Sequence, residues 1–413
     1  MNLRIIRERL HDKNVICYID GIEGEKFVRK YSDIINIAGY FTLANDINID
    51  SIEKYSLKDV LKRENIYIIL CCDNPKNNAK VWNILCDDFS YIEDVAEQDI
   101  VSAVLEGKYD MMLMIGVCQQ KWVSYALNHI TDFNKKNICK YIFFSYLEQK
   151  SYKRMFEKLI EYSSWFIRIK TLIIKGEVNL WLDNICGKYS DRIYNMPFVN
   201  FSAMYPQISW KSSGTNSMMH EYYFESLQYP NIKMRSLLYK DENVLALINE
   251  MRSSEDILKA IMDENYYSKE SMERRIATTF KEMEIVERQC QINVKDWIFD
   301  NYRTKQLYLD AVHFSDALIF QYCREIMRRC NIEYSNFEEF DIIQTQGKLH
   351  KTEYLNEVPI YPSVVKHLGL KWIDDKKLYN CSRASDYKKL SFKDAMLDYI
   401  EYVKLGKQMS YYI

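Results

Sequence analysis

Residues 110–119 read Asp-Met-Met-Leu-Met-Ile-Gly-Val-Cys-Gln, an apolar run that ends at Gly116 and places Cys118 at a polar corner. Residues 120–127 follow without Pro or Gly and carry apolar side chains at helical spacing. The stretch therefore predicts a strand, a tight turn and a helix. Cys118 would lie at the N-terminus of this helix, where unpaired N–H groups and the macrodipole favour a thiolate. A strand-to-helix turn of this kind presents the nucleophile of many hydrolases and acyltransferases.

Two similar strand-and-helix patterns precede this stretch. Residues 14–20 and 66–72 are apolar, and each run is followed by turn residues and a helical pattern. Two such units within one hundred residues predict a small parallel sheet. The motif G-x-G-x-x-G is absent, and Gly21-x-x-Gly24 favours close packing of a helix on a strand over a bound dinucleotide. We therefore predict that residues 1–105 form a Rossmann-like α/β domain, a scaffold or recognition module.

The rest of the chain, residues 106–413, is predicted to form a larger α/β domain with long helices. Only 6 Pro and 11 Gly occur in 413 residues, so helix should outweigh strand. The patterns predict one amphipathic helix within 150–175 and a strand and turn over 198–207. One long helix is expected over 253–290, beginning at the capping residues Ser253 and Asp256. An extended segment over 306–314 should enter a helix at Ser315.

The composition excludes several classes of protein. Basic residues number 56 and acidic residues 58, giving a formal charge of -2, so we expect no nucleic-acid partner. No uncharged run approaches the ~18 residues of a transmembrane helix, and residues 1–9 carry charge where a signal peptide is apolar. The eleven Cys residues lack C-x-x-C spacing, which favours a reducing cytoplasm and predicts no metal site.

His313 is the histidine with the most informative neighbours, because Asp310 precedes it by three residues. The spacing D-x-x-H lets one short segment supply a general base and the carboxylate that orients it, as SGNH-type esterases and acetyltransferases do. Cys118 would then be the nucleophile, in the chain order nucleophile, Asp, His. The alternative is that Cys118 is a small buried thiol, as most free cysteines are.

Four segments, residues 115–119, 198–207, 306–313 and 358–372, together resemble the WcbI family of capsular polysaccharide acetyltransferases. The resemblance covers roughly residues 108–375. The chain departs from the family pattern at three places, where Val117 replaces an asparagine, Tyr205 a histidine and Phe314 a proline. It is therefore identified as a divergent member.

The resemblance implies transfer of an acetyl or related acyl group from coenzyme A to a sugar hydroxyl, without a metal, by an SGNH-like domain. It implies an acyl-CoA donor, a saccharide acceptor and peripheral association with polysaccharide assembly machinery. Cys118 would attack or position the thioester, His313 would act as base and Asp310 would orient it. The implied oxyanion or substrate residues are Gly116, Gln119 and Asn200, and the implied cofactor-binding residues are Lys121, Arg303 and Lys305.

Two other functions fit the same residues. An SGNH-like carbohydrate esterase would use the same residues to remove an acyl group, with water in place of the sugar hydroxyl. A catalytically silent carbohydrate- or partner-binding protein would explain the three departures from the family pattern.

Overall fold

The computed structural model describes residues 3–43, 47–49, 52–72, 77, 80–82, 84–85, 95–148, 150–170, 177–208, 241–335, 339, 357–380 and 389–410. The fold is mixed α/β, as predicted, and the chain divides into two compact units. Unit 1 comprises Met1–Asn195 with Met327–Phe337, and unit 2 comprises Met196–Ile326 with Glu338–Ile413. The predicted boundary at residue 105 falls inside unit 1, between its two sheets, and the division into domains 1–105 and 106–413 stays a prediction.

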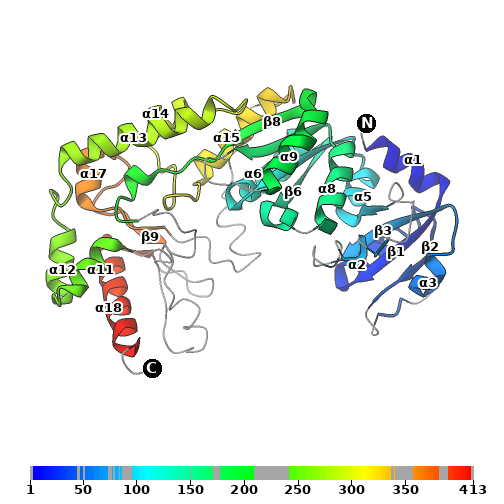
Figure 1. Cartoon of the computed structure of the whole chain (residues 1–413), viewed down its shortest axis with the longest axis horizontal. Helices are drawn as coiled ribbons and strands as arrows, with labels where there is room; N and C mark the ends of the chain where they lie inside the picture. Colours follow the sequence, from blue (N-terminus) through cyan, green and yellow to red (C-terminus); the bar gives the residue numbers. More distant parts are fainter. Residues whose placement is uncertain are drawn as a thin grey trace. The chain divides into compact units, whose positions relative to one another are not determined.

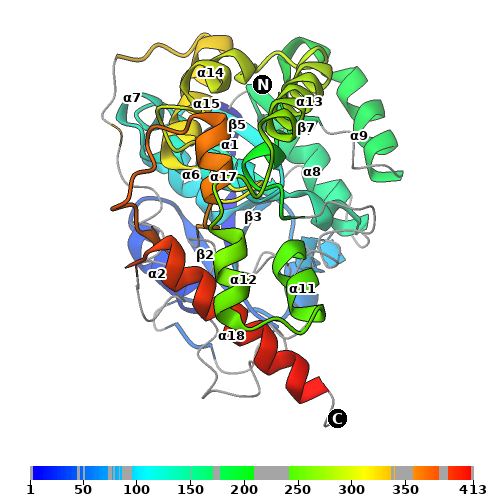
Figure 2. The same ribbon diagram turned by 90° about the vertical axis from the view of Figure 1, so that its left-hand side faces the viewer.

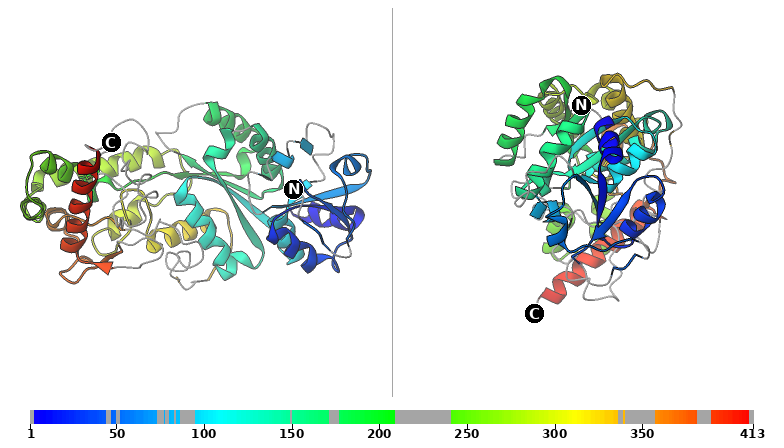
Figure 3. Two further views of the ribbon diagram at one scale, coloured as in Figure 1. Left: turned by 90° about the horizontal axis from the view of Figure 1, so that it is seen from below. Right: turned by 90° about the vertical axis from the view of Figure 1, so that its right-hand side faces the viewer.

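The first sheet of unit 1 is parallel and has the strand order β2-β1-β3-β4. Figures 1 and 3 show its first strands in blue. The strands are β1 (Asn14–Asp20), β2 (Ile37–Phe41), β3 (Ile66–Cys72) and β4 (Val95–Glu97). The helices are α1 (Arg4–Asp12), α2 (Ile22–Tyr31), α3 (Leu57–Val60) and α5 (Gln98–Leu105). Both α2 and α5 pack on the sheet, which confirms the predicted parallel sheet.

Two glycines determine how α2 meets this sheet. Gly21 has a φ of 109°, a conformation that residues with a Cβ rarely adopt. A Cβ at Gly24 would lie 2.7 Å from the backbone oxygen of Cys71 in β3. The pair Gly21-x-x-Gly24 therefore allows close packing of the helix on the strands, as the sequence indicated.

The second sheet of unit 1 has the order β6-β5-β7-β8, which repeats the order of the first sheet. Its strands are β5 (Asp110–Gly116), β6 (Asn137–Phe143), β7 (Trp165–Lys170) and β8 (Ile193–Pro197). The helices are α6 (Cys118–His129), α7 (Thr131–Asn134), α8 (Lys150–Tyr162) and α9 (Glu177–Lys188). Strands of both sheets contribute to one hydrophobic core. The strand, turn and helix predicted from residues 110–127 are confirmed (Figure 2).

Within its unit, β5 occupies the position at which open α/β sheets bind ligands. It pairs in parallel with β6 on one side and with β7 on the other. The chain therefore passes from β5 to β6 on one side of β5 and later returns as β7 on the other side. Ligands of such sheets bind at the carboxyl end of the strand where the order reverses. Here that end is the Gly116 turn.

Unit 2 is mainly helical. Its helices are α11 (Glu242–Asn249), α12 (Ser254–Ile261), α13 (Lys269–Glu287), α14 (Lys295–Asn301), α15 (Asp316–Arg329), α17 (Pro362–Leu368) and α18 (Phe392–Ser410). The last residues of α15, from Met327, belong to unit 1. A short antiparallel pair, β9 (Tyr379–Asn380) and β10 (Lys389–Leu390), precedes α18. Helix α18 packs against α11 and α12 (Figure 2).

Two predicted elements were wrong and a third was right only in part. The amphipathic helix expected within 150–175 is present as α8, but it ends at Tyr162, and β7 follows, in which Arg168 is buried and paired with Asp183. The single helix expected over 253–290 is two helices, because Ser268 caps a second one with its own hydroxyl. The strand expected within 198–207 is absent from that described segment, since β8 ends at Pro197 and a short 3₁₀ helix (Ser202–Met204) follows. The Ser253 cap itself is confirmed, with its hydroxyl accepting from the N–H of Asp256.

Asp241 is a buried carboxylate that should make the stability of unit 2 depend on pH. Its Oδ1 accepts the N–H groups of Asn243 and Val244, each at 3.0 Å, and the Tyr361 hydroxyl donates to its Oδ2 at 2.7 Å. Burial raises the pKa of Asp241 from 3.8 to about 6. The folded state therefore holds this proton more tightly than the unfolded state, and stability falls as pH rises from about 4 to 6.

An Asp241→Asn variant keeps the Oδ1 acceptor and removes the titration. Between pH 4 and 6, the free energy of unfolding of the wild type should fall by up to ~3 kcal/mol more than that of the variant. Urea unfolding of both proteins at pH 4, 5, 6 and 7 measures the difference. Parallel stability curves for the two proteins would contradict this expectation.

Candidate functional site

The turn after β5 is held by two side chains. Val117 occupies the position before α6, and the Gln120 side-chain oxygen accepts its N–H at 3.0 Å. The Tyr141 hydroxyl, from β6, lies 3.2 Å from the Gly116 carbonyl oxygen and 3.0 Å from that of Val117. The turn is thus fixed both by its own helix and by the neighbouring strand. Its geometry places the N-terminus of α6, the positive end of the helix dipole, at the carboxyl end of β5.

Cys118 is the first residue of α6, as predicted, and its side chain lies outside the described part of the structure. Gly116 and Gln119 are buried beside it, and Lys121 is exposed with its ammonium 5.7 Å from the centre of the Trp122 ring. The backbone therefore has the nucleophile-turn arrangement. The reactivity of the thiol stays a prediction.

A methyl group at Gly116 should disturb this turn. An added Cβ would overlap the Gln120 side chain, with Cγ at 2.6 Å and Cδ at 2.7 Å. Gln120 is buried, so it has to give up its bond to Val117 or shift the helix start. We expect Gly116→Ala to destabilise the fold by about 1–3 kcal/mol, as overpacking does.

The same substitution should lower activity by more than its effect on stability explains. Thermal unfolding and the activity assay described below measure the two effects. Gly187→Ala is the matched control, because an added Cβ there meets no atom within 4 Å. Unchanged stability and activity for Gly116→Ala would show that the turn tolerates the methyl group.

Asp310 and His313 form a compact turn in unit 2. The His313 Nδ1 lies 2.6 Å from Asp310 Oδ2, and Asp310 Oδ1 accepts the N–H groups of Val312 and His313, both at 2.8 Å. The turn is closed by Leu309 N–H, which donates to the His313 carbonyl at 2.9 Å. Asp310 is 4% exposed and His313 9%. One carboxylate therefore fixes both the backbone and the imidazole.

This arrangement determines what the imidazole can do. A carboxylate accepts only, so Nδ1 carries the hydrogen and Nε2 is left as the basic nitrogen. The carboxylate also stabilises the imidazolium that forms when Nε2 takes a proton. The predicted Asp-x-x-His pair has the geometry of a general base and its orienting group.

Three segments that the sequence singled out meet around this turn within unit 2. The Phe201 N–H donates to the Ala311 carbonyl at 2.9 Å, and the Val358 N–H donates to the Leu309 carbonyl at 2.8 Å. The Tyr205 hydroxyl donates to the Tyr308 carbonyl at 3.2 Å. Segments 198–207, 306–315 and 357–362 are therefore packed together. Asn200, half-buried, directly precedes the residue that contacts this turn.

The two predicted cations of unit 2 lie in the loop after α14. Arg303 and Lys305 are exposed. The Arg303 Nε donates to the Leu368 carbonyl at 3.2 Å, and the Lys305 ammonium lies 5.7 Å from the centre of the Trp297 ring. Both side chains can offer positive charge at the surface of unit 2.

The predicted residues thus form two groups. Gly116, Cys118, Gln119 and Lys121 belong to unit 1, and Asn200, Arg303, Lys305, Asp310 and His313 belong to unit 2. Joint action of the two groups stays a prediction. Among the described residues no cluster of three His, Cys, Asp or Glu side chains could hold a metal ion, and no described helix is long and apolar enough to cross a membrane.

Sequence reasoning missed two residues that hold the Gly116 turn, Gln120 and Tyr141. Gln120 has a local signal, since Gln three residues after the helix-capping position is typical of a capping box. Tyr141 has none, because its contact with the turn comes from the neighbouring strand. Glu287 is buried at the end of α13, where its Oε1 accepts the N–H groups of Val294 and Lys295 at 2.6 and 2.8 Å. It joins α13 to the start of α14.

Residues 183–335 match the family model described as "Polysaccharide biosynthesis enzyme WcbI". The chain carries a WcbI-family region. The matched residues include Asn200, both predicted cations of unit 2 and the Asp310–His313 pair, and the predicted resemblance is confirmed. The matched region is therefore similar to polysaccharide biosynthesis enzymes.

A solved structure has a similar fold. It is described as WcbI, a novel polysaccharide biosynthesis enzyme, in its native form without a disulfide bond between coenzyme A and one of its cysteines. Its TM-score to this chain is 0.53 at 15% identity, and the match covers 71% of this chain and 89% of that one. At this identity the similarity shows a shared fold. No curated protein sequence matches the chain.

Proposed function

We propose that this WcbI-family chain is an O-acyltransferase, which moves an acetyl or related acyl group from coenzyme A to a hydroxyl of a saccharide in the cytoplasm. The observation that carries the proposal is the buried Asp310–His313 pair, with 2.6 Å between Oδ2 and Nδ1, inside the WcbI-family region. A neutral imidazole held in this way is suited to remove a proton from a hydroxyl or thiol.

The proposed reaction has two steps. The Cys118 sulfur attacks the thioester carbonyl, a new bond forms between sulfur and acyl carbon, and coenzyme A leaves as its thiol with the proton from Cys118. A saccharide hydroxyl then attacks the acyl carbon, His313 Nε2 takes the hydroxyl proton, and the Cys118 thiolate leaves and recovers that proton. Backbone N–H groups at the start of α6, with Gly116 and Gln119, would stabilise the oxyanion, and Asn200 would position the substrate.

Two further observations support coenzyme A as the donor. The description of the WcbI protein of similar fold names coenzyme A, in a native form without a disulfide bond between coenzyme A and one of its cysteines. In this chain Lys121, Arg303 and Lys305 carry exposed cationic heads, the chemistry that binds phosphate groups. These residues fit a donor that bears several phosphates.

Calorimetry with coenzyme A and acetyl-CoA tests the proposal. We expect micromolar binding by the wild type, and loss of thioester turnover in Cys118→Ala without loss of binding. Cys72→Ala is the matched control, because this thiol of unit 1 is half-buried at the end of β3 of the other sheet. An activated Cys118 should also react with iodoacetamide well below pH 8.

Two results would count against the proposal. The first is an absence of binding at millimolar coenzyme A. The second is full thioester turnover by Cys118→Ala, which would exclude the covalent step and leave direct transfer. Release of acyl groups from an acylated saccharide in water, without coenzyme A, would favour the esterase instead.

A further inference from the structure

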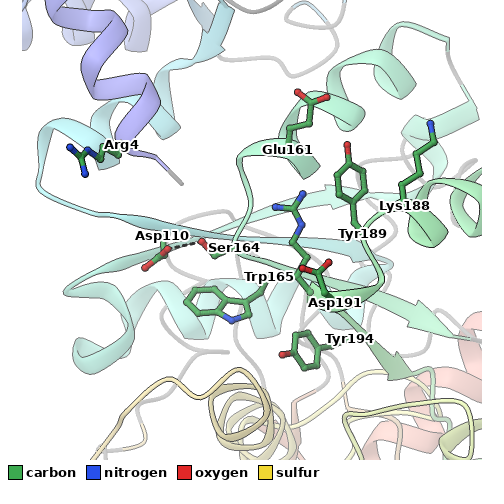
Figure 4. A pocket seen from close by; sticks show the side chains of 10 residues that line it. Arg4, Asp110, Glu161, Ser164, Trp165, Lys188, Tyr189, Asp191 and Tyr194 are labelled. Atoms are coloured by element: carbon green, nitrogen blue, oxygen red, sulfur yellow. Dashed lines mark hydrogen bonds between the residues drawn. The ribbon is translucent and has the colours of Figure 1, made fainter. Parts of the chain in front are cut away.

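A cavity of about 1010 Å³ opens in unit 1. Figure 4 shows the side chains that line it. Asp110 and Trp165, which line it, are the first residues of β5 and β7. The cavity therefore lies at the amino edge of the second sheet, whereas Gly116 is at the carboxyl edge. Seven residues of β5 separate the two edges by roughly 20 Å. Its volume is at the upper end of the range of small-molecule pockets.

Aromatic rings and charged groups of both signs line this cavity. The rings belong to Trp165, Tyr189 and Tyr194. Figure 4 shows Trp165 and Tyr194 on one side of the cavity, with Tyr189 and Glu161 on the other. The charged side chains are Asp110, Glu161 and Asp191, and Arg4, Lys188 and Arg192.

Several of these side chains are already held in place. The Ser164 hydroxyl donates to Asp110 Oδ1 at 2.6 Å. Arg192 donates to the Ser163 carbonyl at 2.6 Å, and its guanidinium lies 4.6 Å from the centre of the Tyr189 ring. A ligand would meet an ordered lining, which lowers the entropic cost of binding.

The chemistry of this lining fits a saccharide. Aromatic faces cover the C–H faces of sugar rings, carboxylates accept hydrogen bonds from hydroxyl groups, and Arg and Lys donate to them. Three acidic and three basic side chains cancel in charge. A nucleotide or other polyanion would instead require a net positive lining, because each carboxylate repels a phosphate.

We propose that this cavity is a saccharide-binding site, which holds a segment of a polysaccharide chain at the amino edge of the second sheet of unit 1. Aromatic contacts with Trp165 and Tyr194 supply most of the affinity, and Asp191 accepts from sugar hydroxyls. The site does not depend on acyl transfer, since its residues are separate from Cys118 and His313.

Binding of saccharides to the full chain, measured without any acyl-CoA, tests this site. The probes are cellohexaose, maltohexaose, chitohexaose and a panel of purified bacterial capsular polysaccharides, followed by calorimetry and saturation-transfer NMR. We expect at least one probe to bind, and Trp165→Ala to weaken it about tenfold or more. Asp191→Asn, an exposed change that leaves the core intact, should weaken the same probe several-fold.

Asp33→Asn is the matched control, because Asp33 is an exposed carboxylate of unit 1 outside the cavity lining. Three results would overturn the proposal. No saccharide probe binds, or a probe binds to both cavity variants as tightly as to the wild type. The third is that UDP binds in place of the saccharides and that the two cavity variants weaken its binding. Failure of the acyltransferase assay would not affect this measurement, because no acyl group takes part in it.

Discussion

A His313→Gln variant should bind coenzyme A as the wild type does and lose about 10³-fold in acyl transfer. Glutamine fills a similar volume and can still donate toward Asp310, but it cannot take up and release a proton near neutral pH. The Asp310 turn would be retained, because its backbone bonds come from the N–H groups of residues 312 and 313. Release of the coenzyme A thiol from acetyl-CoA, followed in the presence of saccharide acceptors, measures the loss.

The matched control for this variant is His11→Gln. His11 is exposed near the end of α1 and is remote in sequence from both predicted groups. It should keep full activity and unchanged stability. If His313→Gln retained a third or more of the wild-type rate with normal folding, another group would have to be the base.

The sequence predicted the elements whose signals are local. The β5 strand and α6 helix follow from an apolar run, a glycine and helical spacing over residues 110–127. The Asp310–His313 contact follows from a separation of three residues. In each case the residues that make the contact are neighbours in the chain, so the pattern contains the information.

The sequence could not predict features that arise from contacts between distant residues. Arg168 appeared to belong to a solvated basic helix, yet it is buried in β7 because Asp183 pairs with it. The break between α12 and α13 was missed because no Pro or Gly marks it, while the Ser268 hydroxyl starts a new helix. Tyr141 reaches the Gly116 turn only because β6 lies beside β5.

Asp310 should be as important for activity as His313, for a different reason. In an Asp310→Asn variant the side-chain oxygen can still accept the N–H groups of Val312 and His313, so the turn should form. The amide nitrogen would then face His313 Nδ1 and donate to it. Nδ1 would become the acceptor, and the hydrogen would move to Nε2, where it blocks uptake of a proton. We expect acyl transfer to fall about 10³- to 10⁴-fold with little change in stability.

Asp310→Ala separates the two roles of this carboxylate. The alanine variant leaves two buried N–H groups without their acceptor and should lose roughly 2 kcal/mol or more in free energy of unfolding. If the asparagine variant were instead as unstable as the alanine variant, the charge of Asp310 would be needed for folding. If it were as active as the wild type, the tautomer of His313 would not matter, and Asp310 would serve the backbone turn alone. Only a stable, inactive asparagine variant is consistent with a carboxylate that orients a general base.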